Sequence, residues 1–193
     1  MKSILVIYNT CGISNREHLD DYVSSIRLIL EQDFNDFDLA VSSCLNKQTT
    51  IDSIRSEFQG SLYINYIKEC HPVNVTFNHT VKKCIEKNGA YGGYLYVDSG
   101  TSFPQKDLLS SLNNYLKTGK YGMITPQPEN DTEYFNGLGA GRRDKDNDYA
   151  REILFKDGDY IIPIGKGVGT HTNLISEELR KTYGNVYPDI FAS

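Results

Sequence analysis

An acidic residue that follows an apolar strand is the chain's best candidate for chemistry. The segment from Gly92 to Thr101 reads GGYLYVDSGT, so aromatic and aliphatic residues alternate until Asp98. This pattern predicts a buried strand whose carboxyl end opens into a loop, where open α/β sheets place their ligands. A carboxylate there can hold a divalent cation that offsets the charge of a departing diphosphate. The alternative is that Asp98 caps the turn formed by the following Ser-Gly.

A glycine-rich run from Gly165 to Asn173 (GKGVGTHTN) contains the second candidate ligand. Its glycines permit close backbone approach to a ligand, and its polar residues suit a phosphate or a metal. His171 is the best second metal ligand in the sequence, and Lys166 can supply positive charge to a diphosphate. The run does not match the phosphate-loop spacing G-x-x-x-x-G-K-[ST], and an ordinary polar contact explains a lone histidine equally well.

Glycine occupies every second position before the paired residues Arg142 and Arg143, in the loop that begins at Asn136. This composition is typical of a flap that meets a phosphate or a sugar. A flexible solvent loop is the equal alternative, because the spacing differs from the dinucleotide fingerprint.

Asp189 is the candidate general base. It follows Pro188 and stands among apolar neighbours, which would raise the carboxyl pKa toward a useful range. The alternative interpretation is that Asp189 starts a helix after Pro188. The sequence stops at Ser193 without an evident finishing element, which is typical of a fragment whose true base lies further on.

The first part of the chain predicts the elements that must position these residues. We expect strands at 3–8, 38–43, 62–67 and 93–98, which alternate with helices at about 19–30, 49–58 and 72–87 and a helix opened by Pro104. Four such units in succession predict a mainly parallel sheet that is covered by helices on both faces. After Gly119 we expect a strand at 121–125 and a hairpin around 156–159 in a loop-rich, antiparallel part.

Composition narrows the function classes. The 193 residues are 39% hydrophobic and 23% charged, which is enough for one ordinary core, and we expect one domain over 1–193. The net charge of −5, with scattered Lys and Arg, argues against a nucleic-acid partner. No apolar run is long enough for a membrane span, so we expect a cytoplasmic protein. Four separated cysteines without a C-x-x-C pair favour reduced thiols.

This order of elements resembles that of the nucleotide-sugar glycosyltransferases with the GT-A fold, over roughly the first half of the chain. The resemblance rests on a first strand that runs into Tyr8, Asn9 and Thr10, on an asparagine in the helix before the fourth strand, and on Asp98 at the end of that strand. A weaker resemblance within that family is to viral enzymes that build capsid glycans.

The resemblance implies roles for individual residues. Tyr8, Asn9 and Thr10 would hold the nucleoside, and Asp98 with a later histidine, His171, would hold Mn²⁺ or Mg²⁺. Asn78 would touch the donor, although an asparagine that holds a neighbouring loop is nearly as good an interpretation. Residues 1–118 would form the nucleotide-binding half, and residues 119–193 would form the acceptor side.

Two features of the sequence depart from the family pattern. Gly100 stands where a second metal carboxylate is expected, and Ser42, Ser43 and Cys44 replace the acid expected after the second strand.

The sequence therefore predicts a glycosyltransferase that moves a sugar from a nucleotide diphosphate donor, a UDP-sugar, to a hydroxyl of a glycan or glycoprotein by an inverting displacement. One alternative is a catalytically silent nucleotide- or sugar-binding module, which Gly100 favours. The other is a nucleotidyltransferase, which should have a Gly-rich basic loop after the first strand. That loop contains only Gly12 and Arg16.

Overall fold

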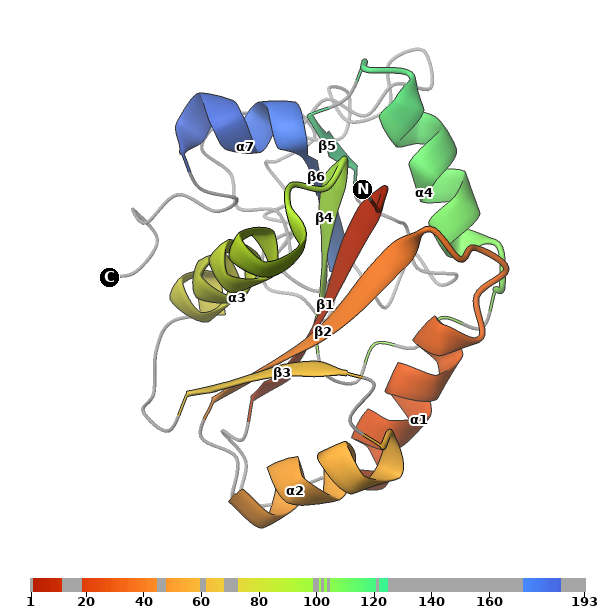
Figure 1. Ribbon diagram of the computed structural model, residues 1–193. Coiled ribbons are helices and arrows are strands. Elements are labelled where there is room, and N and C mark those ends of the chain that lie inside the picture. The colour runs from red at the N-terminus through yellow and green to blue at the C-terminus, as the bar shows by residue number, and fades with distance from the viewer. Residues whose placement is uncertain are drawn as a thin grey trace, which may run out of the picture.

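A computed structural model describes residues 2–11, 19–44, 48–59, 62–67, 73–98, 101, 103, 105–120, 122–124 and 172–184. Within these residues, six strands form one sheet in the order β3-β2-β1-β4-β6-β5 (Figure 1). The strands are β1 (Ile4–Cys11), β2 (Phe37–Cys44), β3 (Tyr63–Ile67), β4 (Gly93–Val97), β5 (Met123–Ile124) and β6 (Thr172–Ser176). The helices are α1 (Leu19–Leu30), α2 (Gln48–Glu57), α3 (Val73–Asn88), α4 (Leu108–Lys117) and α7 (Glu177–Tyr183).

The sheet has a parallel part and an antiparallel edge. Strands β3, β2, β1 and β4 are parallel, whereas β6 runs antiparallel to both β4 and β5. The chain builds outward from β1 through β2 to β3 and then returns to place β4 on the other side of β1. The carboxyl ends of β1 and β4 therefore form a topological switch point, the position where open α/β sheets bind ligands.

Helices cover both faces of the sheet, as the sequence predicts (Figure 1). Side chains alternate along β1, so that Ile4, Val6 and Tyr8 pack with α1, α2 and α4. Leu5 and Ile7 pack on the opposite face with α3 and with Leu179 of α7. The mainly parallel α/β class is thus confirmed, with two apolar cores, one on each face of the sheet.

Two predicted elements differ at their ends. The helix expected from Pro104 begins at Leu108, because the segment before it bonds elsewhere: the Gln105 carbonyl accepts from Gln32 Nε2 at 2.8 Å, and the Lys106 carbonyl accepts from the Asp33 amide at 2.8 Å. Within the strand expected at 121–125, the structure gives β5 over Met123–Ile124, while Tyr121 and Thr125 lie outside the described residues. The hairpin around 156–159 lies outside the described residues.

The sequence interpretation missed β6 and α7. The glycine-rich run was expected to be a ligand loop, but its last two residues, Thr172 and Asn173, begin β6. Helix α7 follows at once, and the Ser176 side chain accepts from the Leu179 amide at its start. No helix in the described part of the chain has the length and apolar character that a membrane crossing requires.

Candidate functional site

Asp98 lies at the carboxyl end of β4, directly beside Asn9 of β1. The parallel register pairs Tyr8 with Val97, so the next residue of each strand stands at the switch point. The Asn9 amide Nδ2 donates to Asp98 Oδ1 at 3.4 Å, and the Asp98 side chain is partly exposed. The Thr101 amide donates to the Asp98 carbonyl at 3.2 Å. The structure thus joins a carboxylate and an amide from two strands that lie 89 residues apart in sequence.

Tyr96 is a contact of Asp98 that sequence reasoning missed. Its hydroxyl donates to the same Oδ1 atom at 3.2 Å. Its ring is buried and meets Phe77 of α3 edge to face, with 5.3 Å between the ring centroids. The period of two in a strand places Tyr96 and Asp98 on one face of the sheet, and this was the available signal.

The face of the sheet under α3 becomes polar toward its carboxyl edge. Ser42, Asn65 and Asn173 are all buried there, and the register places Asn173 opposite Tyr96. Asn65 Nδ2 donates to Thr80 Oγ1 of α3 at 2.8 Å. Ser42 Oγ is buried without a hydrogen-bond partner among the described residues. By register, Ser42 lies beside Asn9 on the neighbouring strand, and Asn65 lies one strand further out.

The other two residues of the first predicted loop face the opposite side. Tyr8 packs in the α1-side core, 6.4 Å from Tyr22 between ring centroids. Thr10 is buried, and its Oγ1 donates to the Ser42 carbonyl at 3.5 Å. Asn78 is partly buried on α3, next to Phe77. Among the predicted donor-binding residues, Asn9 donates a hydrogen bond to Asp98.

Five predicted site residues lie outside the described residues: Lys166, His171, Arg142, Arg143 and Asp189. Thr172, the residue after His171, pairs with Val97, the residue before Asp98.

The chemistry of this edge suits a hard divalent cation that also binds a phosphate. Asp98 supplies one carboxylate, and the described residues contain no cluster of three or more His, Cys, Asp or Glu that could enclose a metal. Mg²⁺ sites of phosphate-transferring enzymes commonly use one or two carboxylates and complete their shell with phosphate oxygens and water. Asp98 therefore has the chemistry of a ligand to a shared cation, and within the described residues it is not part of a closed metal cage.

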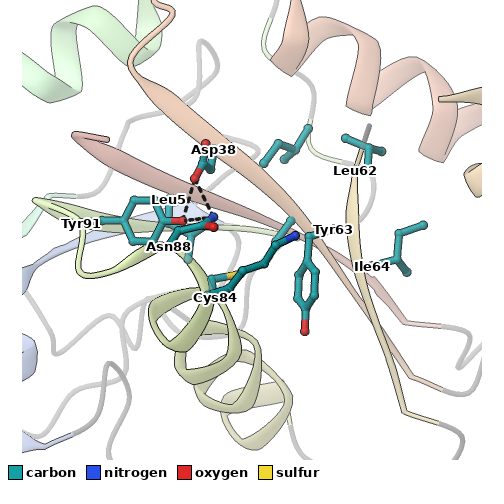
Figure 2. Close-up of a pocket in the computed structure, with 11 residues that line it drawn as sticks. Leu5, Asp38, Leu62, Tyr63, Ile64, Cys84, Asn88 and Tyr91 are labelled. Carbon is teal, nitrogen blue, oxygen red and sulfur yellow. Dashed lines mark hydrogen bonds between the residues drawn. The ribbon is translucent and has the colours of Figure 1, made fainter. Parts of the chain in front are cut away.

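A pocket of about 250 Å³ lies at the opposite, amino edge of the parallel strands, beside the end of α3 (Figure 2). Asp38 Oδ2 accepts hydrogen bonds there from Tyr91 Oη at 2.7 Å and from Asn88 Nδ2 at 3.0 Å. Burial, reinforced by the charge of Asp38, raises the pKa of the Cys84 thiol to about 12. A thiol that stays protonated at neutral pH is a poor nucleophile, so Cys84 does not offer thiolate chemistry in this pocket.

Comparisons with known proteins support the fold. No protein-family model matches the sequence, and no curated protein sequence matches it. The structure is similar to a mannosyltransferase from Pyrobaculum calidifontis, solved with GDP-Man and Mn²⁺, at a TM-score of 0.57 and 14% identity, over 97% of this chain and 48% of that chain. It is also similar to 4-diphosphocytidyl-2C-methyl-D-erythritol synthase, at a TM-score of 0.52 and 10% identity, over 91% of this chain and 76% of that chain.

These likenesses confirm the predicted resemblance at the level of the fold, which is the GT-A type found in nucleotide-diphospho-sugar transferases. The chain spans about half the length of the mannosyltransferase.

Proposed function

We propose that this chain binds a nucleoside diphosphate sugar at the carboxyl edge of its sheet and supports transfer of the sugar to a hydroxyl of a glycan or glycoprotein. The observation that carries the proposal is the Asn9–Asp98 pair at the switch point between β1 and β4. A carboxylate and an amide from adjacent strand ends provide a cation ligand and a neutral hydrogen-bonding group side by side. The similarity of the fold to that of a mannosyltransferase solved with GDP-Man supports a nucleoside diphosphate sugar as the donor.

Asp98 would hold Mn²⁺ or Mg²⁺, together with His171. When bound, the cation would offset the negative charge of the departing diphosphate. Asn9 would line the nucleoside, and Tyr8 and Thr10, whose side chains are buried on the opposite face, would contribute through the backbone of the same strand end. Asn78 would touch the donor from α3. The basic residues Lys166, Arg142 and Arg143 would contact the phosphates.

Asp189 would accept the proton of the acceptor hydroxyl as that oxygen attacks the anomeric carbon. A direct attack of this kind needs one base and one activated leaving group, and it inverts the configuration of the sugar. Holding donor and acceptor in line supplies much of the rate in such a displacement, because the reaction becomes effectively unimolecular.

The test is calorimetry with UDP and with GDP, with and without Mn²⁺, followed by a screen of UDP- and GDP-sugars for turnover. We expect Mn²⁺-dependent nucleotide binding that Asp98→Ala removes. Asp33→Ala is the matched control, because Asp33 is an exposed aspartate between the end of α1 and the start of β2, at the amino edge of the parallel strands, opposite the edge that holds Asp98. It should leave nucleotide binding unchanged.

Two results would favour the alternatives. Metal-independent binding without sugar turnover would support the silent module, which lacks an acid at Gly100. Release of pyrophosphate from a nucleoside triphosphate and a sugar phosphate would support a nucleotidyltransferase, a class to which the fold likeness to the synthase also extends.

A further inference from the structure

We infer that Tyr96 is a positioning residue, whose hydroxyl fixes the orientation in which the Asp98 carboxylate meets its cation. This inference rests on the proposed function, and it adds a residue and a role to it. The direct observation is that Tyr96 Oη donates to Asp98 Oδ1 at 3.2 Å, while Asn9 donates to the same atom from the neighbouring strand.

The need for such a residue follows from where Asp98 stands. Val97 is the last residue of β4 that pairs with β1 and β6, so Asp98 comes just beyond the paired part of the sheet. Its side chain is partly exposed, and an aspartate at such a position has several staggered rotamers available. A metal ligand that must first be ordered loses affinity to the entropy of ordering it. A donor that holds one rotamer removes part of that cost.

Tyr96 is suited to this role because its own ring is fixed. The side chain is 1% exposed and lies under Phe77 of α3, with ring planes at 78° to each other. The strands on either side place Ile7 and Asn173 opposite Tyr96. A buried ring held by a helix and by both neighbouring strands cannot follow Asp98 if the carboxylate turns. Its hydroxyl therefore defines a fixed point for Oδ1.

The missing second acid makes this positioning more important. Gly100 stands at the place of a second carboxylate, and Asn9 and Tyr96 are both neutral donors to Asp98 Oδ1. Such donors orient an anion without adding negative charge beside it. Hydrogen bonds to metal-ligating side chains are commonly worth about 10- to 100-fold in metal affinity. Both bonds to Oδ1 are longer than the usual range, so their loss should cost little folding stability.

The experiment compares Tyr96→Phe with Tyr94→Phe by electron paramagnetic resonance of Mn²⁺ in the presence of UDP or GDP. Tyr94 is the matched control: it lies two residues earlier on the same face of β4 and is equally buried, but its hydroxyl donates to Glu177 at 2.7 Å. We expect Tyr96→Phe to weaken Mn²⁺ binding about 10-fold. Metal-free nucleotide binding should be unchanged in Tyr96→Phe, and Mn²⁺ affinity should be unchanged in Tyr94→Phe.

A second variant tests the same point while keeping the hydroxyl. Phe77→Leu loosens the support of the Tyr96 ring, and we expect a smaller loss of Mn²⁺ affinity than in Tyr96→Phe. Thermal melting of each variant reports its fold separately.

The outcomes separate the two proposals. If Asp98→Ala abolishes Mn²⁺-dependent binding while Tyr96→Phe and Phe77→Leu bind Mn²⁺ as Tyr94→Phe does, the positioning role is wrong and the proposed function stands. If Asp98→Ala itself leaves Mn²⁺ binding with nucleotide unchanged, the proposed metal site is wrong.

Discussion

Asp98 is a single carboxylate, and one carboxylate makes a weak site for a divalent cation unless phosphate oxygens complete the shell. We therefore expect Mn²⁺ alone to bind this protein weakly and to bind much more tightly when UDP or GDP is present. By thermodynamic linkage, Mn²⁺ must raise nucleotide affinity by the same factor. Calorimetric titrations in both orders measure the two factors. Tight Mn²⁺ binding that does not change on adding nucleotide would contradict the shared-cation account.

Gly92 is the residue whose substitution should strain the start of β4. A Cβ atom at this position would lie 2.9 Å from the Ser3 carbonyl oxygen, which already accepts a hydrogen bond from the Gly93 amide. The backbone would have to shift, at a cost of about 1–3 kcal/mol. Urea unfolding of Gly92→Ala measures this cost. A change in the free energy of unfolding below about 0.5 kcal/mol, the usual range for surface substitutions, would show that the contact relaxes freely.

Helix α7 is tied to β4 by an ionic network around Glu177. Tyr94 Oη donates to Glu177 Oε2 at 2.7 Å, and the Arg180 guanidinium donates to both carboxylate oxygens at 2.5 and 2.8 Å. Burial works to raise the pKa of Glu177, but the hydrogen bonds from Arg180 and Tyr94 outweigh it and hold that pKa below its ordinary value.

This depressed pKa predicts a loss of stability in acid. A carboxyl group with a lowered folded pKa contributes stability above its unfolded pKa, about 4.5, and loses that contribution as the pH falls through the folded value. We expect Glu177→Gln to be less stable than the parent at pH 7 and closer to it near pH 3. Thermal melting of both proteins from pH 7 to pH 3 gives the comparison. A difference that does not depend on pH would contradict the role of the ionised carboxylate.

The elements that the sequence predicted well are those whose signals are local. Strands β1 to β4 and helices α1 to α3 follow from hydrophobic period and turn residues, and Gly89 ends α3 with a φ of 84°. The start of α4 depends on Gln32, which lies 77 residues before Leu109 and accepts from its amide at 3.2 Å. No local pattern reveals such a partner. Strand β6 was missed because its identity depends on pairing with β4.

The candidate site also has one part that local sequence signals predict and another part that depends on distant partners. The sequence predicted a strand that ends at Asp98, and the acidic residue type at that end marked it as a candidate ligand. Predicting the hydrogen bond from Asn9 to Asp98 requires the strand order. Predicting the one from Tyr96 requires knowing that the Tyr96 ring is held in place by Phe77. The alternation along the strand places Tyr96 and Asp98 on one face of the sheet, but it does not show that their side chains form a hydrogen bond.

At the scale of the whole molecule, the sheet serves as the rigid support of the site, because β4 is buried along its full length. Leu95 is fully buried in the core on the α1 side, whereas Leu30 is 44% exposed. We expect Leu95→Ala to lower the free energy of unfolding by about 2–5 kcal/mol. Leu30→Ala should lower it by less than about 1 kcal/mol, in line with its partial exposure. Urea unfolding monitored by circular dichroism measures both, and equal effects would contradict the assigned core.

The central claim is that the strand end at the switch point between β1 and β4 binds a cation shared with a nucleoside diphosphate. The most direct measurement is an anomalous difference map from crystals soaked with Mn²⁺ and GDP or UDP. The account predicts a manganese peak in contact with the Asp98 carboxylate and with the diphosphate oxygens, with Tyr96 hydrogen-bonded to Asp98. A nucleotide and metal bound elsewhere, with the Asp98 side chain turned into its own loop, would contradict it.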